Sequence, residues 1–216
     1  MEYSNNIKNE GLEEILVIPS LEINDILPFS NKLIKNIEIQ DFCNSICQKI
    51  QVISKGSADH HPEFRQFVTY SIIKIDNNFY MTLLRKPDSW EERLHNKLTI
   101  GIGGHVNSSS CDSTNNQQLF EIIYRSMWRE IDEEVNIRKV ANLKKEIFLG
   151  LLNNDAETDR EHIGFVWNLD FACKNIGSII CKEHKLSDLS LFNPEDLKER
   201  FNKFESWSQI LLKDII

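Results

Sequence analysis

The 216-residue chain is acidic, with a formal net charge of −8, and 41% of its residues are hydrophobic. This length and apolar content suit one large domain, or one domain with an appendage, and the negative charge argues against nucleic-acid polymers and anionic membranes as partners. The five cysteines follow no zinc or disulfide spacing, the first ten residues have no apolar core of a signal peptide, and no apolar run could span a bilayer. We therefore expect a protein of the reducing cytoplasm.

The N-terminal residues 1–60 contain two predicted elements. A short apolar run predicts a strand over residues 14–20. Apolar residues then recur at i, i+3, i+4 and i+7, which predicts an amphipathic helix over residues 39–53. Cys43 and Cys47 lie on its apolar stripe, where free cysteine behaves as a small hydrophobic residue.

A β-hairpin is predicted next. Residues 66–75 and 79–85 are rich in β-branched and aromatic side chains, and an Asp-Asn-Asn turn separates them. The segment "LTIGIGGHV" (98–106) predicts a strand that runs into glycines, and the polar residues 107–118 predict a loop.

The C-terminal half mixes helices and strands. Apolar runs predict strands over residues 147–153, 162–171 and 176–184. The segment 193–204 opens with Asn, Pro and two acids, which is typical of a helix N-terminus, and a last helix is expected over residues 206–216. This mixture indicates the α/β (α+β) class.

The most unusual feature is the end of the helix predicted over residues 119–135, where "REIDEEV" crowds acids together. At about 100° per residue, Glu130, Glu133 and Glu134 share an arc of roughly 100° beside the apolar stripe. Like charges at these spacings repel each other, and the negative end of the helix dipole adds a penalty. A hard divalent cation would relieve this repulsion, because such ions prefer oxygen ligands. A solvated acidic face is the alternative interpretation.

The segment from Glu121 to Ile137 reads E-x7-R-E-I-x-E-E-x-N-I. It resembles the second part of the Nudix signature, G-x5-E-x7-R-E-U-x-E-E-x-G-U, in which U is apolar. The segment "GIGGHVN" (101–107) is similar to the glycine-ended strand that opens this signature. The wider pattern resembles a subgroup of MutT-like predicted phosphoesterases. The resemblance implies a Nudix-type α/β/α sandwich with a mixed sheet over residues 61–216, preceded by an N-terminal extension over residues 1–60.

The sequence departs from the signature at two places. Sixteen residues separate Gly104 from Glu121 where the family has five, so an insertion falls in the polar segment 107–118. Asn136 occupies the position of the family's glycine after the helix. Asparagine is the next best residue for a left-handed helix end, which is the conformation expected there.

The resemblance also implies an activity, because Nudix enzymes hydrolyse a nucleoside diphosphate linked to another moiety with Mg²⁺ or Mn²⁺. Glu133, Glu134 and the Gly104 carbonyl would bind the metal here. Glu130 would be either a further ligand or the general base that deprotonates water. A divalent metal also explains how a chain of charge −8 could bind an anionic substrate.

Further roles follow from the same resemblance. Arg129, together with Glu121, would hold the acidic cluster in place. The candidate substrate-binding residues are Arg85, Arg93, His105 and Glu161. For the arginines a plain surface role is the alternative, and for His105 a structural hydrogen bond is the alternative. The expected partner is a small phosphorylated, nucleotide-like molecule, and a homodimer is expected from the fold.

Two other functions on this fold stay open. One is a catalytically silent Nudix module that senses or binds a nucleotide. The intact acidic triad favours the hydrolase over this alternative, since a pure binder has less reason to carry mutually repelling charges. The other is an isopentenyl-diphosphate isomerase-like enzyme, which relies on a cysteine that "GIGGHVN" lacks. The signature does not specify which diphosphate compound is the substrate, because fold alone does not choose it.

Overall fold

The computed structural model describes residues 13–59, 61–76, 78–86, 94–108, 118–156, 159–182 and 186–215. Over these residues the fold is α+β, with helices and a mixed sheet, as predicted. Within the same residues, every helix is too short or too polar to cross a bilayer.

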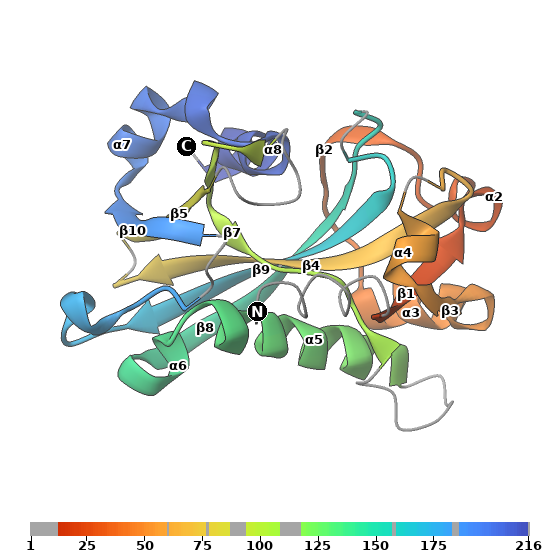
Figure 1. The fold of residues 1–216 in the computed structure, drawn as a ribbon, viewed down its shortest axis with the longest axis horizontal. Helices are drawn as coiled ribbons and strands as arrows, with labels where there is room; N and C mark the ends of the chain where they lie inside the picture. Colours follow the sequence, from red (N-terminus) through yellow and green to blue (C-terminus); the bar gives the residue numbers. More distant parts are fainter. Residues whose placement is uncertain are drawn as a thin grey trace, which may run out of the picture. The chain divides into compact units, whose positions relative to one another are not determined.

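Figure 1 shows the elements in sequence colours. The strands are β1 (Glu14–Pro19), β2 (Ser30–Ile34), β3 (Gln51–Ser54), β4 (Phe64–Ile75), β5 (Phe79–Arg85), β6 (Leu98–Thr99), β7 (Gly101–Ile102), β8 (Asn142–Asn153), β9 (His162–Ala172) and β10 (Leu186–Phe192). The α-helices are α2 (Ser20–Ile23), α3 (Ile39–Ile46), α4 (Lys55–Ala58), α5 (Gln118–Glu134), α6 (Ile137–Val140), α7 (Pro194–Glu199) and α8 (Ser206–Ile215). Short 3₁₀ turns are η1 (Cys47–Lys49), η4 (Ile176–Ser178) and η5 (Phe201–Lys203). The main path of the sheet runs β10-β5-β4-β9-β8-β2.

The chain divides into two compact units. Unit 1 comprises residues 1–69, 104–127 and 150–165, and unit 2 comprises residues 70–103, 128–149 and 166–216. The boundary expected after residue 60 is a different kind of division, between an extension and a Nudix domain, and it stays a prediction.

Unit 1 is built around β1, which pairs antiparallel with both β3 and β4. Figure 1 shows β1, β3 and α4 side by side. Apolar residues of these elements are fully buried against one another, namely Ile15, Val17 and Ala58. Phe165 of β9 makes edge-to-face ring contacts with Phe42 in α3 and Phe67 in β4. The N-terminal elements therefore share a core with β4 and β9.

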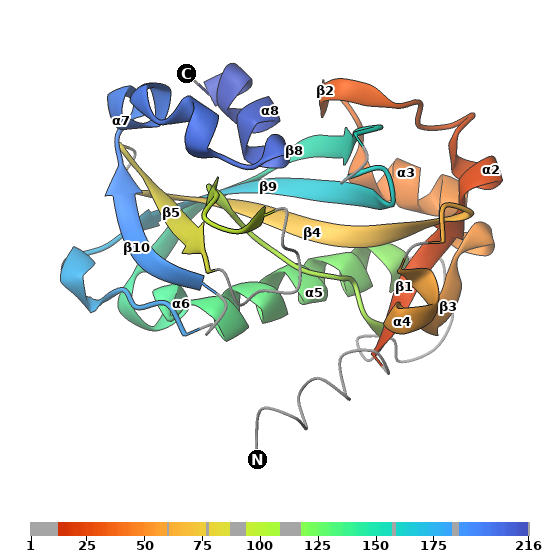
Figure 2. The ribbon, with the colours of Figure 1, turned by 45° about the horizontal axis from the view of Figure 1, so that its top comes forward.

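Unit 2 places β5 beside β10, β6 and the end of β4 (Figure 2). A buried hydroxyl network joins this sheet to α8. The Tyr70 hydroxyl donates to Glu205 Oε1 at 2.5 Å and lies within hydrogen-bond distance of Thr99 and Ser208. The Tyr70 ring also fills the space beside Gly101, where an added Cβ would lie 1.9 Å from the ring. That close approach explains one of the glycines in the "GIGGHVN" segment.

Several predicted elements are confirmed. The hairpin forms as β4 and β5, and the acidic helix forms as α5. The helix start at Asn193 is also confirmed, because its side chain accepts from the Asp196 N–H in a capping box. That helix is interrupted after Glu199, and η5 completes the segment.

The helix predicted over residues 39–53 is too long, because α3 ends at Ile46 and β3 follows η1. Residues 51–54 are taken up by pairing with β1, a long-range contact that local periodicity does not reveal. The strand predicted over residues 98–106 is reduced to the short β6 and β7.

The strand predicted over residues 176–184 is wrong. Residues Ile176–Ser178 form η4, and the strand of this region is β10, which begins at Leu186. The expected strand over residues 147–153 is confirmed, but β8 begins five residues earlier, at Asn142. Its first four residues are exposed, and three of them are polar, so they lack the apolar signal on which the prediction relied.

The buried thiol of Cys43 makes the stability of the fold decrease at alkaline pH. Its thiol is fully buried, and burial, with a smaller contribution from Cys47, raises its pKa from 9.0 to about 12. The unfolded chain releases this proton near pH 9 and the folded chain only near pH 12. The contribution to stability is therefore fully present below pH 9 and is lost between pH 9 and about pH 12, by about 1.4 kcal/mol per pH unit.

We expect Cys43→Ala to reduce this pH dependence. The measurement is the free energy of unfolding in urea on both sides of pH 9, for the wild type and the variant. For each protein, the slope of this free energy against pH is determined. The difference between the two slopes gives the contribution of Cys43, because every other titrating group is common to both. Equal slopes would show that the thiol does not titrate differently in the two states.

Candidate functional site

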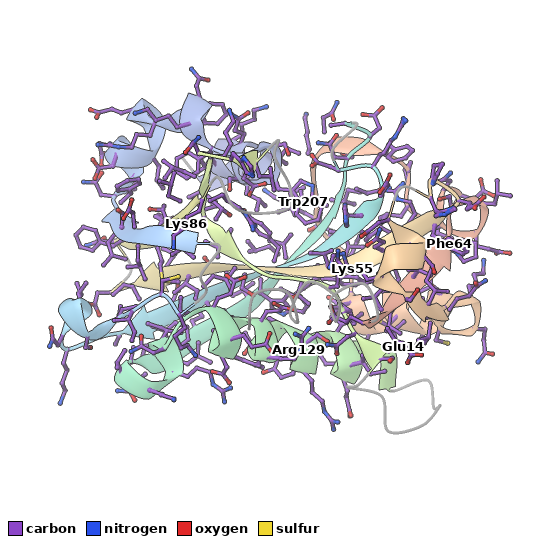
Figure 3. All side chains as sticks on the ribbon, viewed as in Figure 1. Glu14, Lys55, Phe64, Lys86, Arg129 and Trp207 are labelled. Atoms are coloured by element: carbon purple, nitrogen blue, oxygen red, sulfur yellow. The ribbon has the colours of Figure 1, made fainter. Side chains whose placement is uncertain are left out.

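The predicted acidic cluster lies on the last turn of α5, in unit 2. Arg129, labelled in Figure 3, forms two ion pairs with acids of this turn. Its Nη2 donates to Glu130 Oε1 at 2.6 Å, and its Nη1 donates to Glu133 Oε2 at 3.0 Å. The pairing with Glu133 is the i, i+4 contact expected along one helix face. One guanidinium therefore holds two of the three acids.

The three acids differ in their exposure to solvent. The Glu133 side chain is 55% exposed, whereas that of Glu130 is 13% exposed. Glu134 is buried, with 8% of its surface exposed. Charges sheltered in this way interact more strongly than charges in bulk water, both with each other and with a cation. Glu130 and Glu134 are thus the acids best placed to gain from a bound ion.

The end of α5 is fixed by residues 178–182. The Glu134 carbonyl accepts from the Lys182 N–H at 2.6 Å. The Asn136 side chain donates to the Ser178 carbonyl at 2.9 Å and accepts from the Ile180 N–H at 2.8 Å. These bonds position the acidic turn through the backbone that follows it.

The expected left-handed conformation of Asn136 is wrong, because its φ is −95°. Asparagine acts here through its side-chain amide, which has both a donor and an acceptor and binds the backbone of Ser178 and Ile180. A glycine, as in the family signature, could not form the two side-chain bonds.

The donor set of this turn suits a hard divalent cation, since Mg²⁺ and Mn²⁺ prefer carboxylate oxygens. In the arrangement that the structure describes, no three side chains of His, Cys, Asp or Glu converge as a ready metal site within the described residues. The Arg129 guanidinium occupies oxygens of Glu130 and Glu133 instead. The residue types therefore fit the predicted metal. In this structure the positive charge beside Glu130 and Glu133 is that of Arg129.

Gly104, His105 and Glu161 lie in unit 1, as does Glu121 of α5. The Gly104 carbonyl accepts from the Thr69 N–H at 2.9 Å, and its second lone pair can take another partner. His105 faces His162, with ring centroids 5.7 Å apart. Glu161 uses its backbone carbonyl to bind the chain of β4. The metal and substrate roles assigned to these residues stay predictions.

The remaining predicted residues are placed as follows. Glu121 forms an exposed ion pair with Arg125 at 3.7 Å, one turn further along α5. Arg85 ends β5 and exchanges backbone hydrogen bonds with residues 96–97. Arg93 lies outside the described residues.

Arg65, which sequence reasoning did not single out, is almost completely buried in unit 1. The available signal was a charged residue between the aromatic positions of "FRQF", directly before the strand predicted over residues 66–75. A charged residue in a strand normally lies on the exposed face, so the burial of Arg65 was not expected.

Comparison with known proteins adds to this geometry. No family model matches the chain. Protein YmaB of Bacillus subtilis (strain 168) is 26% identical over 205 residues, which cover 93% of this chain and 96% of that protein. The crystal structure of Tm1382, described as a candidate Nudix hydrolase, matches 94% of this chain and 98% of its own, with a TM-score of 0.73 and 23% identity. DR0079 from Deinococcus radiodurans matches 76% of this chain and 90% of its own, with a TM-score of 0.51 and 17% identity.

The match to Tm1382 extends over nearly the whole of both chains. It shows that this chain has the Nudix fold, as the resemblance in the glycine strand and the acidic helix predicted. The fold alone does not define the reaction.

Proposed function

We propose that the chain is a divalent-metal-dependent hydrolase that cleaves the diphosphate linkage of a nucleoside diphosphate joined to another group. The observation that carries this proposal is the last turn of α5, where Glu130 and Glu134 have little exposed surface and Arg129 pairs with Glu130 and Glu133. Sheltered acids at a helix C-terminus are unfavourable on their own. Their presence on a Nudix fold is most simply explained by a bound cation.

Each residue of the turn has a proposed role. Glu133 and Glu134 hold the metal, with the Gly104 carbonyl as a further ligand. Bound Mg²⁺ or Mn²⁺ would neutralise diphosphate charge and make a water molecule more acidic. Glu130 either joins the ligands or accepts the proton from that water. Arg129 keeps Glu130 and Glu133 in position through its two ion pairs.

Substrate contacts are proposed for residues outside this turn, with Arg85 and Arg93 as the basic candidates for phosphate. His105 and Glu161 are proposed as further contacts. A homodimer and a cytoplasmic location stay predictions of the sequence.

The test is a panel of diphosphate compounds that includes nucleotide sugars, dinucleoside polyphosphates, oxidised nucleotides and nucleotide coenzymes. Release of phosphate or nucleotide is measured with Mg²⁺, with Mn²⁺ and with a chelator. We expect at least one compound to be hydrolysed, and the chelator to lower the rate about 100-fold or more. Hydrolysis that persists in the chelator would contradict the metal requirement. Tight binding of a compound without turnover would contradict the hydrolase and support the sensing module.

A further inference from the structure

Arg65 is a buried cation in the middle of unit 1. It lies on β4 opposite Ile18 of β1, and 1% of its surface is exposed. A guanidinium carries five N–H donors and keeps its charge in proteins. Burying such a group is unfavourable unless its donors and its charge are both matched.

The hydrogen bonds of Arg65 satisfy only part of its guanidinium group. Nη2 donates to the Asn153 side-chain oxygen and, at 3.0 Å, to the His162 carbonyl. The ring of Phe29 covers the guanidinium, with 4.5 Å between the ring centroid and Cζ. Nε and Nη1 are buried without an acceptor among the described residues. Three of the five guanidinium N–H donors therefore have no acceptor among the described residues.

The charge of Arg65 is also unmatched, since no ion pair joins it to an acid in the described part of the chain. Two acids of unit 1 have other partners: Asp59 binds Lys55 at 3.1 Å, and Asp159 accepts from Asn154 at 3.1 Å. Burial lowers the pKa of Arg65 to about 10, which still leaves it protonated at neutral pH. A full positive charge is thus held inside unit 1 with a cation–π contact and neutral acceptors as its described partners.

We propose that Arg65 anchors an anion-binding site in unit 1 that takes a phosphate-type oxyanion. Such a ligand would supply both missing features, because its oxygens accept several hydrogen bonds and its charge balances the guanidinium. Arginine forms stronger hydrogen bonds with phosphate than with neutral acceptors. This site needs no metal, which separates it from the hydrolysis proposed for the acidic turn.

Phe29 covers the guanidinium of Arg65 and is itself in contact with solvent. Its ring is 45% exposed, although it covers a buried charge. It belongs to the segment between α2 and β2, whose Leu27 carbonyl accepts from the Asn153 side-chain nitrogen at 2.6 Å. Asn153 therefore binds both the arginine and the segment that covers it. The pairing of β4 with β1 involves residues 17–19 and 64–66, so it does not depend on this segment.

The test uses the full chain with a chelator present, so that no metal centre contributes. Inorganic phosphate is titrated against sodium chloride of equal ionic strength, while the melting temperature and the side-chain Nε–H resonance of Arg65 are followed by calorimetry and NMR. We expect phosphate, and not chloride, to raise the melting temperature and to shift this resonance. A resonance that does not move up to saturating phosphate would overturn the proposal without any variant.

Two variants complete the test. Arg65→Met removes the charge and preserves apolar volume, and we expect it to weaken phosphate binding at least about tenfold. Lys49→Met removes one positive charge from a partly exposed position of the same unit, where Lys49 pairs with Glu22 at 2.9 Å. We expect this control to bind phosphate like the wild type. Equal loss in both variants would mean that phosphate responds to net charge alone, and the site would be rejected.

Discussion

Replacing Glu134 by glutamine is expected to lower kcat/KM for the best diphosphate compound by about 10³-fold, within the range found for lost metal ligands and acid–base groups. The amide has nearly the same shape but no charge, so it cannot balance a divalent cation. Because Glu134 is buried at the end of α5, no solvent-exposed carboxylate can replace it easily. Steady-state kinetics and Mn²⁺ titration of the same preparation measure both effects.

Glu199→Gln is the matched control for this variant. Glu199 lies on α7, its side chain is 75% exposed, and its contact with Arg200 is a long one at 3.7 Å. The change of charge is the same, but we expect wild-type kinetics. If Glu134→Gln turned over substrate and bound Mn²⁺ like the control, the acidic turn would not be the metal site.

Replacing Gly150 by alanine is expected to destabilise the fold by about 3–5 kcal/mol and to lower Tm by roughly 10 °C. Gly150 has a φ of +140°, a conformation that side chains rarely adopt. An added Cβ would also lie 2.1 Å from the Ile34 carbonyl oxygen, where β2 pairs with β8. Since the obstacle is backbone, it cannot rotate away as a side chain could.

Gly177→Ala serves as the comparison. Gly177 has no such positive φ, and an added Cβ would lie 3.4 Å from the Asn175 side-chain oxygen, an ordinary contact. Thermal unfolding of both variants should therefore show a large loss only at position 150. A similar Tm for the two variants would mean that β2 can move away from β8 at little cost.

Local periodicity in the sequence predicted those elements whose residues lie in one short, continuous stretch. The amphipathic pattern of α5 and the paired runs of the β4–β5 hairpin both lie within short stretches of sequence. β3 and β10 were missed because each is defined by a partner strand far away in the chain, β1 and β5 respectively. Strand propensity reflects such partners more than the strand's own sequence.

The candidate site was predictable to the extent that one helix carries it. The spacing of four brought Arg129 to Glu133 as expected along one face. The same reasoning could not identify Arg65, because its burial depends on Phe29 and Asn153, which are distant in sequence. It also could not show how Asn136 binds residues 178–180, a contact between parts of the chain more than forty residues apart.

The tether between Asn136 and residues 178–182 has a consequence for how this protein can vary. The orientation of the acidic turn depends on a stretch of backbone that itself supplies no proposed ligand. Changes in the length of that stretch would rotate the carboxylates while leaving every one of them present in the sequence. Relatives that retain the full acidic motif but differ there can therefore differ in catalytic competence, which inspection of the motif alone would not reveal.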